Sequence, residues 1–197
     1  MISVRVTGPA SWNVPAIERT ASGIGNPQAL LKVLGTAVAE TMRGHFLARD
    51  AEPNKKGWPK QHFWKDIADA TVRGEPSADR IEVVVADRRF ALKVYGGTVR
   101  PVEARALAIP MNRIAYGVRP RVLADQLGVP IFQPRKSDGV GAGFLAARIE
   151  GEFVVLYSLV RSARHEPDQR AMPPAETVWK AITEGLDDHL AALASAN

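Results

Sequence analysis

The sequence contains no cysteine among its 197 residues. This absence excludes disulfides, thiolate metal sites and cysteine nucleophiles, and it favours a protein made in the cytosol. Long apolar runs are also missing. The longest, residues 153–160, is interrupted by Ser158 and is less than half as long as a bilayer-spanning helix. The first six residues lack the apolar stretch of a secretory signal, so we expect neither a signal peptide nor a membrane partner.

The remaining composition is that of a folded globular chain. Hydrophobic residues make up 46% of the sequence and charged residues 24%, which are ordinary values for such a protein. The length fits one domain, so we expect a single α+β domain over residues 1–197. Residues 8–27 are rich in Gly and Pro and predict an extended N-terminal connection.

Apolar periodicity predicts two long helices, one over residues 27–49 and one from the Pro173-Pro174 pair to about residue 194. The apolar stripe of the second consists of Val178, Ile182, Leu186, Leu190 and Leu193. A shorter helix is expected at residues 60–72. It begins beside an aromatic group, Trp58, Phe63 and Trp64, which we expect to lie in the core or, as a second choice, at an interface.

Alternating patterns predict strands at residues 3–7 and 105–111 and two β-hairpins, 80–86 with 90–95 and 144–149 with 153–160. Because the strands come as hairpins, the sheet should be mainly antiparallel, with helices packed on it. Residues 112–143, partly helical at 121–126, are expected to form a projecting loop or arm. Gly96 and Gly97 are expected to allow an unusual backbone conformation near an interface.

The net charge of +5 is concentrated in one segment. Residues 100–136 contain only two carboxylates, Glu103 and Asp125, and seven basic residues: Arg100, Arg105, Arg113, Arg119, Arg121, Arg135 and Lys136. The segment alone therefore accounts for +5. An arginine-rich loop of this kind suits contacts with DNA phosphates or with an acidic neighbouring protein, and it is equally consistent with a solvated loop.

Catalytic and metal-binding patterns are missing from the sequence. The four histidines, His45, His62, His165 and His189, lie in separate segments without a metal-ligand spacing. We interpret His45 as meeting free carbonyls at the end of its helix, and His189 as lying on a solvated helix face. There is no GxSxG motif, and the glycines of 139–143 follow no nucleotide-binding pattern. We therefore predict no catalytic residues, no metal, no cofactor and no enzymatic activity.

Three stretches carry a resemblance to a known family. The first is NKKGWP at residues 54–59, followed by HFW at 62–64. The second is YGGTVRP at 95–101, leading into ARALAIP at 104–110. The third is PDQRAMPP at 167–174. Together they resemble the phage virion morphogenesis family, the tail-completion proteins that include the G protein of Mu-like phages and prophages.

This resemblance implies a structural virion protein of a tailed bacteriophage, assembled in the host cytoplasm. It would act at the neck or the head-proximal end of the tail, as a tail-completion or tail-terminator protein in head–tail joining. It implies a homohexameric ring, with neighbouring neck, tail-tube or head-closure proteins as partners. The basic residues would then face genomic DNA in the lumen or an adjoining ring. The alternatives are a basic nucleic-acid-binding module and, less favoured, a small hydrolase.

Overall fold

A computed structural model of the chain describes residues 4–5, 27–54, 56–77, 80–134 and 143–195. The fold is α+β with antiparallel sheets, as the sequence predicts. The expected connection at 8–26 lies outside the described residues, as do 135–142 of the expected arm. No helix among the described residues is long and apolar enough to cross a membrane.

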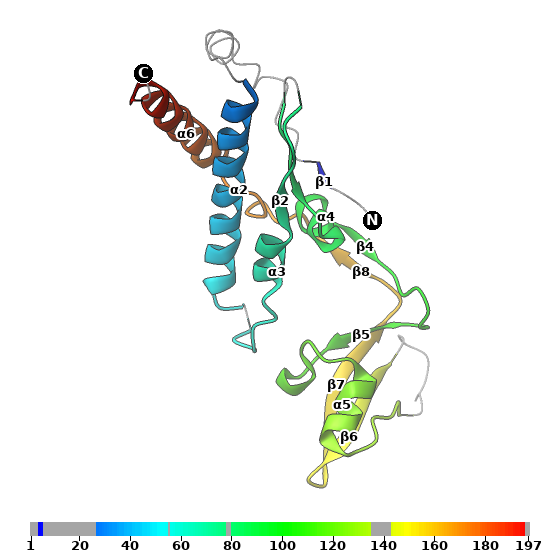
Figure 1. Ribbon diagram of the computed structural model, residues 1–197. Coiled ribbons are helices and arrows are strands. Elements are labelled where there is room, and N and C mark those ends of the chain that lie inside the picture. Colours follow the sequence, from blue (N-terminus) through cyan, green and yellow to red (C-terminus); the bar gives the residue numbers. More distant parts are fainter. Residues whose placement is uncertain (1–3, 6–26, 55, 78–79, 135–142, 196–197) are drawn as a thin grey trace. The chain divides into compact units, whose positions relative to one another are not determined.

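The chain, expected to be a single domain, divides into two compact units (Figure 1). Unit 1 combines residues 1–52, 62–95 and 167–197, and unit 2 combines 53–61 and 96–166. Each unit has its own apolar core.

Unit 1 is built on the long helix α2 (Pro27–Ala51), which runs beside α6 (Ala175–Ser195) and α3 (Phe63–Asp69) (Figure 1). Its sheet has the antiparallel order β1 (Val4–Arg5), β3 (Val83–Val85) and β2 (Thr71–Arg73). The main core gathers side chains of α2, α3, β3 and α4: Met42, Phe46, Ile67, Val85 and Phe90 are all at most 1% exposed. The two long helices of the sequence analysis are thus confirmed.

The hairpin expected at 80–86 and 90–95 is wrong, because residues 88–95 form helix α4 (Arg88–Tyr95). Phe90 is fully buried and Val94 packs against the same core, one helical turn further on. Asp87 begins the helix, since its carboxylate accepts the Arg89 N–H at 2.8 Å. Apolar residues at 90, 92 and 94 fit both a strand and a short helix, and this capping aspartate is what the strand prediction overlooked.

The helix expected over 60–72 is also shorter in the structure. It ends at Asp69, and the chain turns directly into β2, which pairs with β3 in the register Val72↔Val84. The Thr71 hydroxyl, fully buried, donates to the Ile67 carbonyl at 2.8 Å and closes the end of the helix. The strand predicted at 80–86 therefore exists, but its partner is β2 rather than residues 90–95.

Unit 2 contains a three-stranded antiparallel sheet in the order β5 (Leu107–Pro110), β7 (Glu152–Val160) and β6 (Phe144–Ile149). The β6–β7 hairpin is confirmed, with its turn at Glu150-Gly151. A separate two-stranded sheet pairs β4 (Gly97–Val99) with β8 (Ala163–His165). This second sheet is not predicted from the sequence, because both strands are only three residues long and carry little apolar signal.

One face of the β5–β7–β6 sheet is covered by helices. These are the 3-10 helix η2 (Arg113–Ala115) and α5 (Pro120–Leu127), which lies over the sheet in Figure 1. Ala115 and Leu123 are buried there against Ala147 and Leu156. Residues 113–115 and 120–127 of the expected projecting arm are therefore folded onto the sheet, since their apolar side chains complete the core of unit 2.

A β-bulge decides which side chains of β7 face this core. The register passes from Leu145↔Tyr157 to Ala146↔Val155, so β7 has one extra residue. Leu156 and Tyr157 are both buried as a result. The Tyr157 hydroxyl donates to the Val118 carbonyl at 2.8 Å, and burial raises the pKa of this phenol.

Candidate functional site

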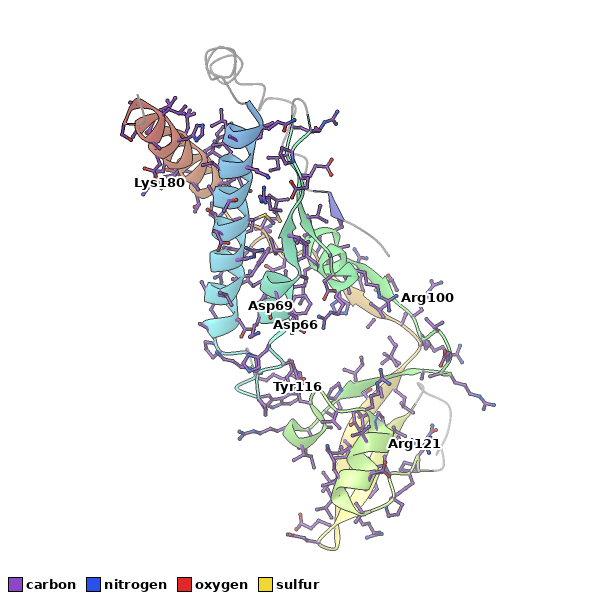
Figure 2. The ribbon with its side chains drawn as sticks, viewed as in Figure 1. Asp66, Asp69, Arg100, Tyr116, Arg121 and Lys180 are labelled. Atoms are coloured by element: carbon purple, nitrogen blue, oxygen red, sulfur yellow. The ribbon has the colours of Figure 1, made fainter. Side chains whose placement is uncertain are left out.

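The predicted basic residues belong to unit 2 and come from several of its elements. Arg100 and Arg105 lie between β4 and β5, Arg113 begins η2, Arg119 directly precedes α5, and Arg121 lies within α5. All five are exposed. Figure 2 shows Arg100 and Arg121 at separate places in the unit. Arg135 and Lys136 lie outside the described residues.

None of these five arginines forms an ion pair with a carboxylate in the part of the chain that the structure describes. The same is true of two exposed arginines that the sequence analysis did not single out, Arg148 in β6 and Arg161 after β7. We call this set the unpaired arginines: Arg100, Arg105, Arg113, Arg119, Arg121, Arg148 and Arg161. Arg148 and Arg161 both lie outside the basic segment 100–136. For Arg148 the available signal was a charged residue next to apolar neighbours in a predicted strand.

The two units differ in net charge. Over its sequence ranges, unit 2 has 13 Lys and Arg against 6 Asp and Glu, a formal charge of +7. Unit 1 has 13 against 15, a formal charge of −2. The basic character of the chain therefore belongs to unit 2, and it extends beyond residues 100–136.

In unit 1, in contrast, most Lys and Arg side chains bind carboxylates, carbonyls or aromatic rings of the same unit. Arg49 of α2 donates to Asp168 at 2.9 Å and to the Arg170 carbonyl, and its guanidinium lies 4.4 Å from the centre of the Trp64 ring. Burial by itself raises the pKa of Asp168, but the bonds from the Arg49 side chain and the Arg170 N–H outweigh it and lower this pKa. These contacts of Arg49 attach residues 168–170, which belong to the third stretch of the resemblance, to α2.

Two further hydrogen bonds hold the same segment to α2 and to the residue that follows this helix. His45 donates to the Arg170 carbonyl at 3.0 Å, and the Arg170 guanidinium donates to Glu52. The interpretation of His45 is thus correct in kind, but the carbonyl comes from a segment 125 residues away rather than from its own helix.

A second engaged cation is Arg89 of α4. It binds Asp87 at 2.6 Å and Asp66 of α3 at 2.9 Å. The side-chain hydrogen bond from Arg89 lowers the pKa of Asp87, and the same bond raises the pKa of Arg89. The pair therefore links two helices inside unit 1 and leaves the guanidinium occupied.

The predicted aromatic group divides between the two units. Trp64 is stacked on Phe46 at 6.0 Å between ring centres and meets Phe63 edge-on at 5.1 Å, so both belong to the unit 1 core. Trp58 belongs to unit 2, where its ring meets Tyr116 at 5.1 Å. Trp58 and Trp64 are therefore only six positions apart in the sequence but belong to different units.

Gly96 and Gly97 both have positive φ angles, 67° and 142°, in the range that favours glycine. Gly97 then begins β4, opposite His165 of β8. The expected unusual backbone is therefore present. Its place beside an interface remains a prediction.

The histidines of unit 1 form one pair with a carboxylate among the described residues. His62 donates to Asp50 at 2.8 Å, an oriented pair at the start of α3. His189, expected on a solvated face, is instead half-buried, and its Nε2 has no hydrogen-bond partner among the described residues. No group of three or more His, Asp or Glu side chains able to hold a metal is present in the described part of the chain.

A depression of about 490 Å³ lies beside α2 and α6 in unit 1. Lys32 and Arg73 contribute positive charge to its lining, and Asp188 lines it too. Glu75 lies 3.7 Å from Lys32 and 3.9 Å from Arg73. Because these two carboxylates offset the two cations, the depression does not select a ligand of either sign.

Comparison with models of known protein families, with curated proteins and with solved structures finds no match to this chain.

Proposed function

We propose that this chain is a structural protein of a tailed-bacteriophage virion that acts at the neck or the head-proximal end of the tail, where its copies form a hexameric ring. Its role would be tail completion or tail termination in head–tail joining, with adjacent neck, tail-tube or head-closure proteins as partners. The proposal assigns the chain no catalytic residue, metal or cofactor. It locates the working protein in the virion, after assembly in the host cytoplasm.

The observation that carries this proposal is the set of unpaired arginines on the surface of unit 2. Seven exposed arginines have no carboxylate partner among the described residues, in a unit of formal charge +7. Guanidinium groups pair with carboxylates and phosphates through a planar fork of donors, so they suit both an acidic neighbouring ring and DNA in a lumen. The resemblance of three stretches, including the glycine pair at the start of β4, is the reason for proposing a phage neck.

The test is genetic. Deleting the gene from the particle-producing strain should leave heads and tails unjoined or tails with unfinished ends, and the protein should be detected in purified virions by mass spectrometry. Normal particles from the deletion strain, or virions without the protein, would contradict the proposal.

A matched pair of variants then tests the arginines. We expect Arg119→Glu/Arg121→Glu to fail in complementation, while its fold survives because acidic residues suit the first turn of α5. As a control, Lys32→Glu/Lys65→Glu reverses two exposed charges in unit 1. Their ion pairs with Glu75 and Asp69 lie at the surface and contribute little to stability, so this variant should fold and complement. If the Arg119→Glu/Arg121→Glu variant complemented as well as this control, the two arginines would have no role in assembly.

A basic nucleic-acid-binding module is the second candidate, favoured by the charge of unit 2 alone. A protein whose main partner is DNA should bind it tightly when isolated, with an affinity that falls steeply as salt is raised. Tight, salt-dependent binding by the purified chain, together with its absence from virions, would favour this alternative.

A further inference from the structure

The face of the β5–β7–β6 sheet opposite α5 carries a cluster of aromatic side chains, which we call the outer face. The register places Phe153, Val155 and Ala146 on it, and Phe132 joins through its bridge to Ala146. The ring of Phe153 lies 6.2 Å from both the Phe132 and the Phe144 ring. These apolar side chains therefore form one continuous group.

No described element covers this group. Phe132, Phe144, Phe153 and Val155 are between 36% and 49% exposed, whereas Leu156 and Tyr157 on the other side of β7 are buried. Contiguous exposed aromatic surface of this kind marks an interaction site. The outer face also has a positive charge at its end nearest the hairpin turn, because Arg148 lies directly opposite Phe153 in the register.

A second uncovered apolar surface lies at the end of α6. The apolar stripe of this helix is covered over only part of its length. Ile182 and Leu186 indeed pack against Leu30 and Leu34 of α2, but Leu190 and Leu193 are 38% and 40% exposed. The stripe therefore continues past the described helix that covers it.

The end of α6 is acidic where the outer face is basic. Asp187 is exposed and lies three residues before Leu190, on the neighbouring part of the helix surface. The helix as a whole has four carboxylates against one lysine. The end of α6 thus combines exposed leucines with negative charge. It complements the outer face, which combines exposed aromatic side chains with an unpaired arginine.

We propose that the outer face of one copy binds the α6 end of the next copy, with Leu190 and Leu193 against Phe144 and Phe153 and with Asp187 near Arg148. This contact rests on the proposed function, because it is the head-to-tail interface of the ring. Two identical outer faces would bring Arg148 against Arg148, and two α6 ends would bring carboxylates together. Like charges therefore disfavour a symmetric dimer, whereas the unlike pairing can repeat around a ring.

Cross-linking tests this pairing directly, because the natural chain has no cysteine. Val155→Cys and Leu193→Cys are made as separate single-cysteine variants of the full chain and mixed with a short bismaleimide. We expect cross-linked dimers that contain one of each variant, identified by mass spectrometry. Dimers of the Val155→Cys variant with itself, or no cross-link at any protein concentration, would overturn the proposal.

A charge exchange provides a second test that does not alter the apolar side chains. Arg148→Glu alone and Asp187→Arg alone should each weaken self-association about tenfold or more, measured by sedimentation, since like charges would then meet. Combining them in one chain should restore association. Failure of the combined variant to recover, while its circular dichroism and unfolding match those of the natural chain, would overturn the pairing.

These outcomes are separable from the proposed function. Hetero-cross-links in a protein that is missing from virions would retain the contact and reject the phage role. If the protein were found in the neck but only Val155→Cys self-dimers formed, the phage role would be retained and the contact rejected.

Discussion

Unit 1 and unit 2 contain the same number of Lys and Arg residues and use them in opposite ways. In unit 1, cations such as Arg49 and Arg89 bind carboxylates of the same unit and stack on or near its aromatic rings. In unit 2, Arg164 is the arginine with an ion pair among the described residues, and seven others have none. Partners inside a unit hold that unit together, so the unpaired arginines are the groups left to act on something else.

The same contrast holds for aromatic side chains. Phe46, Phe90 and Trp64 pack together in unit 1, whereas Phe132, Phe144 and Phe153 of unit 2 touch one another but stay open to solvent. Burial in one unit serves folding. Exposure in the other leaves apolar area whose removal from water can drive association.

The largest expected effect compares a buried with an exposed phenylalanine. Phe46→Ala should lower the free energy of unfolding by about 3–5 kcal/mol, because it empties a fully buried site. Phe153→Ala should cost less than about 1 kcal/mol and should weaken self-association instead. Urea unfolding and sedimentation measure the two quantities. A loss of folding stability at Phe153 as large as that at Phe46 would end the distinction between the two units.

The next comparison is between an engaged and an unpaired arginine. Arg49→Ala should destabilise the fold by about 2 kcal/mol, because it removes the cation bound to the Asp168 carboxylate and one of the two donors to the Arg170 carbonyl, and because it uncovers Trp64. Arg121→Ala should change the free energy of unfolding by less than about 0.5 kcal/mol. Denaturant midpoints check both values, and an Arg121 variant as unstable as the Arg49 variant would contradict the account.

Two glycines should respond in opposite directions. Gly44 lies in the exposed middle of α2, where an added methyl meets nothing, so Gly44→Ala should stabilise unit 1 by about 0.5–1 kcal/mol. Gly128 ends α5 in a left-handed conformation, with φ of 64°, so Gly128→Ala should destabilise unit 2 by about 1 kcal/mol. Amide hydrogen exchange assigns each change to its unit. Changes of the same sign in both variants would disagree with these backbone conformations.

The smallest expected signal is a pH dependence confined to unit 1. The folded-state pKa of Asp168 is lowered, so its stabilisation is present above the ordinary value near 3.8 and is lost as pH falls through the folded-state pKa. Asp168→Asn should flatten the fall in stability on the acid side. Unfolding free energies of both proteins across that range supply the measurement, and parallel pH profiles would show that Asp168 does not contribute.

The part of the fold that sequence predicts well is the part with long, regular apolar patterns. The α2 stripe and the β6–β7 hairpin are examples, because many residues agree on one period. Residues 88–95 were mistaken for a strand because eight residues are too few to separate the two periods. The β4–β8 pair was missed because its partners are about 65 residues apart and carry little apolar signal.

The candidate site was predicted only in part, for a similar reason. Charge counting found Arg100 to Arg121 as a local excess, but Arg148 and Arg161 became members of the set only when the ion pairs of each unit were known. Leu190 and Leu193 continue the helical spacing of the α6 apolar stripe, a pattern typical of buried residues. Their exposure depends on where α2 begins relative to α6, and no local pattern contains that information.

The most direct test of the account is electron cryomicroscopy of the neck of intact virions from the strain that encodes this chain. The account predicts a six-fold ring of this protein at the head-proximal end of the tail, with the outer face of each copy against the α6 end of its neighbour. A neck built without this chain would contradict it.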